Sequence, residues 1–93
     1  MTEPLRNEQV LNLCRAFVNL NDTESVYAFL EDVASPGEIR AMAQRLEAAR
    51  LLSDSKTYSE IMKATGAGTA TISRVKRCLD SGSGGYKSVL SGL

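Results

Sequence analysis

The sequence predicts an all-α protein made of six short helices. Apolar residues recur at intervals of three and four positions in each segment between turns, which is the spacing of one helical face. No segment shows the strict alternation of apolar and polar residues that is typical of half-buried strands. Short clusters of turn residues separate the helical segments, and 93 residues is the length of one domain, so we expect residues 1–93 to form a single domain.

The composition excludes several classes of protein. No run approaches the roughly 18 apolar residues of a membrane span, and the N-terminal residues 1–8 lack the apolar stretch of a secretory signal. We therefore expect a cytoplasmic protein with no membrane partner. The chain has no histidine, and Cys14 and Cys78 lie on separate predicted helices. We expect these to be reduced, partly buried thiols, with no metal site and no cofactor.

The first two helices carry one apolar face each. The first is expected from about Pro4 to Asn19, and its apolar residues are Val10, Leu11, Cys14, Phe17 and Val18. The second follows a break at residues 21–23, where Asp22 and Thr23 are good N-cap residues. Its apolar residues are Val26, Phe29, Leu30 and Val33.

The third helix is expected to be the longest and to be apolar on two sides. Ser35 can form a capping box with Glu38, and Pro36 suits the first helical position. One stripe comprises Ile39, Met42, Ala43, Leu46, Ala49 and Leu52, and a second side comprises Ala41, Ala48 and Leu51. Such a helix usually lies at the centre of a bundle or at a dimer interface.

Three further short helices follow a polar turn at residues 53–56. Thr57 and Glu60 repeat the capping-box pattern and open the fourth helix, which ends at Gly66. The fifth helix starts at Thr69 or Thr71 and directs Ile72, Val75 and Leu79 inward. After a flexible turn at residues 81–85, a last helix is expected over residues 86–93.

Residues 57–79 have the layout of a helix-turn-helix. Two helices that cross steeply through a short turn require a residue that accepts a positive φ, and Gly66 is that residue. Ile61, Ile72 and Val75 can pack into a small core that fixes the angle between the helices. The outward face of the second helix then comprises Thr69, Ala70, Ser73, Arg74 and Arg77.

This outward face is suited to the major groove of double-stranded DNA. Small residues near the start of the helix permit close approach to base edges. Arg74 can reach a guanine or a phosphate, whereas Lys63, Lys76 and Arg77 are better placed for the backbone. Backbone amides near Thr57 and Thr69 can also bind phosphate. The candidate DNA-binding residues are Thr57, Ser59, Lys63, Gly68, Thr69, Ala70, Thr71, Ser73, Arg74 and Arg77.

The distribution of charge agrees with this interpretation. The net charge is zero, but residues 56–93 carry six basic and two acidic residues, whereas residues 1–55 carry five basic and nine acidic residues. The second part can therefore face phosphate while the first stays clear of it. A chance imbalance on solvated helices is the alternative.

The segment Gly66-Ala-Gly-Thr-Ala-Thr-Ile-Ser-Arg74 resembles the turn and recognition helix of the Trp repressor superfamily, which reads Gly-Ala-Gly-Ile-Ala-Thr-Ile-Thr-Arg. The segments 35–52, 56–61, 74–79 and 84–87 resemble the YerC/YecD-type branch of that superfamily. The resemblance covers roughly residues 12–93. It implies a six-helix Trp-repressor-like fold and an intertwined homodimer.

The same resemblance identifies a candidate effector pocket. In the Trp repressor two arginines sandwich the indole ring of tryptophan, and they align with Arg45 and Arg74. The glycine that leaves room for the indole is Val75 in this chain, and the serine that binds the amino group is Cys78. A branched side chain would fill the indole space, so we do not expect tryptophan as corepressor. The effector is left open.

The roles of Arg45 and of two positions on the first motif helix can differ from those in the Trp repressor. Arg45 can alternatively be structural and pair with Glu38, Glu47 or a carboxylate of a partner chain. The positions where the repressor's first motif helix carries DNA-contacting basic residues are Ser59 and Met62 here, so the bases read should differ.

Two functional hypotheses follow from the residues. The first is a homodimeric, sequence-specific transcriptional regulator, in the simplest case a repressor. The second is a protein-interaction module that keeps the Trp-repressor fold without specific DNA binding. For the motif itself, the alternative is an ordinary helical hairpin with a solvated basic face. An enzyme is not expected, because the sequence shows no nucleophile–base pair and no phosphate-binding glycine loop after a strand.

Overall fold

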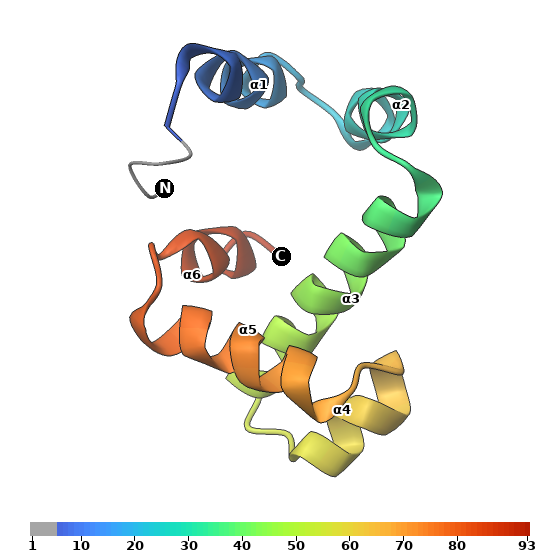
Figure 1. Cartoon of the computed structure of the whole chain (residues 1–93), viewed down its shortest axis with the longest axis vertical. Helices are drawn as coiled ribbons and strands as arrows, with labels where there is room; N and C mark the ends of the chain where they lie inside the picture. The colour runs from blue at the N-terminus through green and yellow to red at the C-terminus, as the bar shows by residue number, and fades with distance from the viewer. Residues whose placement is uncertain (1–5) are drawn as a thin grey trace. The chain divides into compact units, whose positions relative to one another are not determined.

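The computed structural model describes residues 6–93, and all of the regular structure in that range is α-helical (Figure 1). The helices are α1 (Glu8–Val18), α2 (Thr23–Val33), α3 (Pro36–Ser53), α4 (Tyr58–Thr65), α5 (Thr69–Ser81) and α6 (Gly85–Leu90). The predicted all-α class and the order of the six helices are confirmed.

The chain divides into two compact units, with the boundary near the start of α3. The first unit ends at Ile39, and the second is Arg40–Leu93. The single domain expected from chain length stays a prediction.

The helices of the first unit begin at side-chain caps. The Oδ1 atom of Asn7 accepts a hydrogen bond from the backbone N–H of Val10 at 2.9 Å, and Asp22 accepts one from Ser25 at 2.8 Å. Since Asn7 is the cap, the predicted start of α1 near Pro4 is too early, and Pro4 itself lies outside the described residues. Asp22 is the cap of α2, as the break at residues 21–23 predicts.

The first unit contains no fully buried residue in its two helices. The rings of Phe17 and Phe29 meet edge to face, with 5.3 Å between their centroids. Two helices of 11 residues each have too little surface to enclose a core of their own, so Val18 remains 80% exposed and Cys14 is exposed. The prediction that Cys14 is partly buried is therefore wrong for the single chain.

The second unit has a small core where the last turns of α3 meet α4 and α5 (Figure 1). Its buried residues are Ala48, Ile61, Ala67 and Ile72, and Leu51, Leu52 and Tyr58 pack against them. Ala49 and Val75 are also buried. The predicted inward positions of Ile61, Ile72 and Val75 are confirmed, although Val75 is not part of the same cluster.

The fully buried residues of α3 lie in its C-terminal half. The helix opens with the predicted capping box, in which Ser35 and Glu38 exchange hydrogen bonds of 2.7 and 3.1 Å. Ala48 and Ala49 are fully buried, but Met42 is 40% exposed and Ala43 is exposed as well. The apolar surface predicted for this helix is therefore real, and a large part of it faces outward.

The helix α3 ends in a left-handed turn at Ser55, whose φ is 61°. The N–H of Lys56 donates to the carbonyl of Leu51, and the N–H of Ser55 donates to that of Leu52, both at 3.0 Å. This pair of bonds is the Schellman motif, which satisfies carbonyls that would otherwise lack partners at a helix end.

The last helix is shorter than the sequence predicts. It ends at Leu90 rather than Leu93, because residues 91–93 form a turn that leaves Leu93 76% exposed. None of the helices within residues 6–93 is long and apolar enough to cross a membrane. The same residues hold no cluster of potential metal ligands.

Candidate nucleic-acid interface

The turn between α4 and α5 has the backbone that a helix-turn-helix needs. Gly66 follows α4 with φ 75° and ψ 2°, and its N–H donates to the carbonyl of Met62 at 2.9 Å. An L-residue with a Cβ adopts this left-handed conformation only at a cost in free energy. The positive φ predicted for Gly66 is confirmed.

The hydroxyl of Thr65 braces the same turn from within. Its Oγ1 donates to the carbonyl of Ile61 at 2.8 Å and accepts from the N–H of Ala67 at 3.1 Å. Ala67 is buried, and its N–H is therefore satisfied without water. The turn is short and internally bonded, so the direction in which α5 leaves α4 is defined.

A third contact joins the turn to α3. The Nε2 atom of Gln44 donates to the carbonyl of Thr65 at 3.0 Å. Gln44 is not among the residues that the sequence predicts for this site, and its one signal there is a polar residue within the apolar surface of α3.

The helix α5 separates a buried side from an exposed one. Ile72 and Val75 are buried, and Leu79 is partly buried. At 100° per residue these positions lie opposite the exposed positions Thr69, Ala70, Ser73, Arg74 and Arg77. Thr71 lies at the edge of this face and is partly buried. The structure thus brings the predicted base-reading residues together on one exposed surface, hereafter the α5 outer face.

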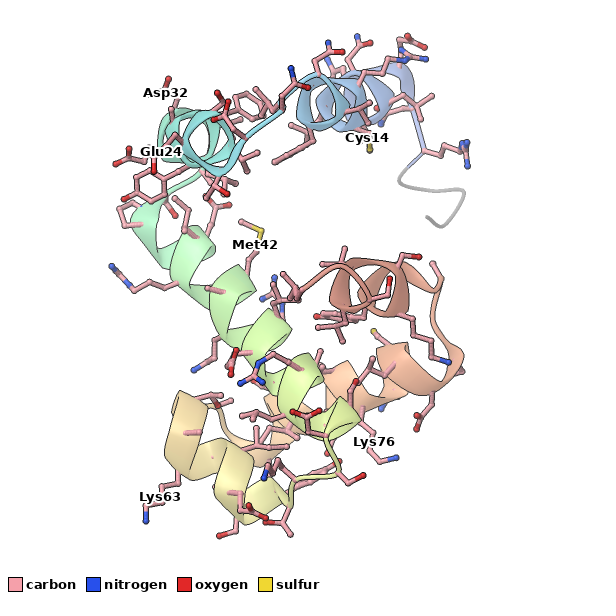
Figure 2. The ribbon with its side chains drawn as sticks, turned by 180° about the vertical axis from the view of Figure 1, so that it is seen from behind. Cys14, Glu24, Asp32, Met42, Lys63 and Lys76 are labelled. Atoms are coloured by element: carbon pink, nitrogen blue, oxygen red, sulfur yellow. The ribbon has the colours of Figure 1, made fainter. Side chains whose placement is uncertain are left out.

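The basic residues near the α5 outer face differ in whether they form an ion pair within the chain. Arg74 and Arg77 are exposed, and Lys63 projects outward from α4 (Figure 2). None of these three has an ion-pair partner in the part of the chain that the structure describes. Lys76 donates instead to Asp80 at 3.0 Å, one turn along α5, and this bond raises the pKa of Lys76. Lys63, Arg74 and Arg77 are therefore the cations left open to phosphate.

The starts of the two helices are not equivalent. Thr57 and Glu60 form the predicted capping box of α4, and the bond from the Thr57 N–H lowers the pKa of the Glu60 carboxyl. A carboxylate at this helix start opposes a phosphate there. Gly68 caps α5 without any side-chain hydrogen bond, which leaves the amides of the first turn available to an anion. Thr57 and Ser59 are exposed, as are Lys63 and Gly68.

The residues of the candidate effector pocket lie in different environments. Arg45 and Arg74 are exposed, and Val75 is 2% exposed. Cys78 is exposed rather than partly buried, because it lies on the flank of α5 away from the core. It lines an open apolar cavity of about 420 Å³ with Leu46, Ser83, Gly85, Tyr86 and Val89. Arg45, Arg74 and Val75 are not among the lining residues of that cavity.

Arg45 has no ion pair within residues 6–93. Glu47 accepts hydrogen bonds from Arg50, and Glu38 is engaged with Ser35 in the capping box of α3. The pairing of Arg45 with Glu38 or Glu47 that the sequence allowed is therefore wrong. A carboxylate of a second chain is the alternative that stays open.

The sequence of this chain is similar to those of known proteins. A family model described as Trp repressor protein matches residues 8–93. An uncharacterised protein of Bacillus subtilis (strain 168), YerC, is 44% identical over 88 residues, which is 95% of this chain and 85% of that protein.

Two solved structures are similar as well. The first is a crystal structure of a candidate Trp repressor from Staphylococcus aureus, with a TM-score of 0.90 and 38% identity, which covers 96% of this chain and 89% of the other. The second is a TrpR-like protein from Eubacterium eligens ATCC 27750, with a TM-score of 0.92 and 41% identity over 97% and 93% of the two chains.

Proposed function

The chain belongs to the Trp repressor family, and on that premise we propose that it is a homodimeric, sequence-specific DNA-binding regulator of transcription that acts as a repressor by occupying its operator. Membership of this family favours a DNA-binding regulator and gives no reason to expect an enzyme. The observation that carries the proposal is the α5 outer face, where small residues and two unpaired arginines share one exposed surface.

The α5 outer face has the dimensions and chemistry of a major-groove reader. A helix of 13 residues is roughly 20 Å long and about 10–12 Å wide, and it fits a groove about 12 Å wide. Thr69, Ala70 and Ser73 are short enough to let the backbone approach the base edges. Arg74 and Arg77 lie farther along, where they contact guanine or phosphate. The open amides of the first turn of α5 supply a further phosphate contact.

A second copy of the chain is the partner that the exposed apolar surface favours. Among residues 6–93 only six hydrophobic residues are buried, and five of the large exposed ones are more than half exposed, namely Val18, Tyr27, Val33, Val89 and Leu93. A chain of this size gains stability by burying such surface in an oligomer. Two α5 helices related by a two-fold axis would then enter successive major grooves, about 34 Å apart.

Tryptophan is not the corepressor in this proposal. Val75 is 2% exposed, and its branched side chain stands where the glycine of the Trp repressor leaves room for the indole ring. Calorimetry with millimolar tryptophan should give no saturable signal, whereas a saturable signal would contradict this part of the proposal.

The proposed site of action is the cytoplasm, where bacterial chromosomal DNA lies.

A salt titration on random duplex DNA tests the proposal. Affinity should fall steeply with salt, and Arg74→Ala/Arg77→Ala should weaken binding and reduce the salt dependence. Arg6→Ala/Arg40→Ala is the matched control, because it removes the same charge from exposed positions outside the helix-turn-helix. No binding at low salt by a folded dimer would overturn the proposal and favour the protein-interaction module instead.

A further inference from the structure

Gln44 connects α3 with the helix-turn-helix. Its side-chain amide spans 21 residues to the carbonyl of Thr65, and the bond is partly buried. The amide also lies over Gly66, since a Cβ on that glycine would be 3.9 Å from Nε2. Within residues 6–93, no other side-chain hydrogen bond is recorded between α3 and either α4 or α5.

The apolar core alone does not fix the orientation of α5 on α3. Its buried members are Ala48 from α3, together with Ile61, Ala67 and Ile72 from the helix-turn-helix. Contacts between such aliphatic groups are non-directional, so they favour burial without selecting one rotation of the motif. A hydrogen bond constrains both distance and angle. The bond from Gln44 is therefore the directional element of this interface.

The acceptor of this bond has no intrahelical alternative. Thr65 is the last residue of α4, and the carbonyls of the last turn of a helix lack partners within it. A rotation of the motif away from α3 would leave the Thr65 carbonyl partly buried and without its donor. That loss penalises other orientations of the motif.

We infer that Gln44 is a positioning residue for DNA recognition, which orients the α5 outer face through the Thr65 carbonyl and so presents it in a reading geometry before any DNA is bound. The inference rests on the proposed function. Gln44 itself is not a DNA contact, because its amide is directed at the turn behind the α5 outer face.

The affinity test compares Gln44→Met with Gln9→Met. Methionine retains the length and much of the volume of glutamine but has no donor. Gln9 is the other glutamine of the chain, and it is exposed on α1. Binding would be measured to a duplex selected by the wild-type protein from a random pool, and to random duplex. Gln44→Met should bind the selected site about three- to tenfold more weakly, as expected for one hydrogen bond, with binding to random duplex changed less than twofold. Gln9→Met should change neither.

Equal affinities of Gln44→Met and wild type for the selected site would overturn the inference and leave the proposed function standing. If wild type binds no duplex at all, the proposed function fails, and the inference fails with it.

Residual dipolar couplings of the free protein supply a readout without DNA. The couplings of α5 relative to those of α3 should change in Gln44→Met and remain unchanged in Gln9→Met. Unchanged couplings in Gln44→Met would contradict the inference whatever the affinity data show. If Gln44→Met does not fold, Gln44→Asn takes its place, because it keeps the amide but shortens its reach by one methylene.

Discussion

Ile61 of α4 and Ile72 of α5 are both fully buried, and they belong to the same core cluster beneath the helix-turn-helix. The two side chains lie on opposite sides of the Gly66 turn, and both share this cluster with Ala48 of α3. These two aliphatic side chains thus stabilise the second unit by burial, and the hydrogen bond from Gln44 supplies the directional contact with α3.

Truncation of Ile72 should therefore be strongly destabilising. Ile72→Ala is expected to lower the free energy of unfolding by about 2–5 kcal/mol, and Ile72→Val by about 0.5–1.5 kcal/mol, because each removes buried methyl groups and leaves a cavity. Chemical unfolding followed by circular dichroism measures both. A graded loss supports the buried position, whereas equal stability of Ile72→Ala and wild type would show that the cluster is not the core.

The left-handed backbone at Gly66 makes a second prediction. Gly66→Ala should destabilise the protein by about 1 kcal/mol, since alanine is strained at φ 75°. Gly85→Ala is the matched control, because Gly85 lies in the first turn of α6 with open space around it and no positive φ. It should leave stability unchanged or raise it slightly. Losses of the same size in both variants would refute the assignment of strain to Gly66.

Ser55 offers the reverse experiment. It adopts φ 61° at the end of α3, where glycine is the favoured residue. Ser55→Gly should stabilise the protein by about 0.5–1 kcal/mol, and Ser55→Val should destabilise it, because a β-branched residue is poorly tolerated in this region. Thermal unfolding of the two variants beside wild type decides the matter. A lower midpoint for Ser55→Gly would be incompatible with the Schellman turn described above.

The capping box of α4 predicts a dependence of stability on pH. The hydrogen bond from Thr57 lowers the pKa of Glu60 below the ordinary value of about 4.3. A carboxyl whose pKa is lower in the folded state contributes stability above its unfolded pKa, and that contribution is lost as the pH falls through the folded pKa. Glu60→Gln keeps an acceptor at this position but removes the titration.

Unfolding curves from pH 7 to pH 3 should therefore show a smaller loss of stability for Glu60→Gln than for wild type below about pH 4.3. The backbone N–H of Ser35 donates to the Glu38 carboxylate in the same way and lowers its pKa. Glu38→Gln should therefore behave like Glu60→Gln. Glu24 is exposed in the first turn of α2 and forms no hydrogen bond recorded within residues 6–93, so Glu24→Gln is the control. Parallel pH curves for wild type and both capping variants would contradict the prediction.

Much of the fold follows from local rules. Some features depend only on residues within four positions of one another, and the structure confirms them. They are the capping boxes at Ser35 and Thr57 and the left-handed conformation of Gly66. The inward positions of Ile72 and Val75 follow from helical periodicity. The Trp-repressor-like fold was predictable because the turn and recognition helix together form a specific motif.

The features that the sequence did not reveal depend on distant partners or on weak local preferences. The acceptor of Gln44 is a backbone carbonyl 21 residues away, and no side-chain pattern encodes such a partner. Ser55 adopts a conformation that glycine prefers, so its position at the end of α3 carried no signal. Cys14 and Cys78 are exposed and not partly buried, because apolar spacing identifies a helix face but does not say what covers it.

The most direct test of the central claim is selection of binding sites from a random duplex pool by the wild-type protein. The account predicts enrichment of a two-fold symmetric sequence whose half-sites are centred about 10–10.5 base pairs apart, since each protomer of a homodimer would place one α5 in the major groove. Arg74→Ala/Arg77→Ala should enrich no such sequence from the same pool. A wild-type pool that stays random after repeated rounds, or that yields single half-sites without a partner, would contradict the claim that this chain is a dimeric reader of DNA sequence.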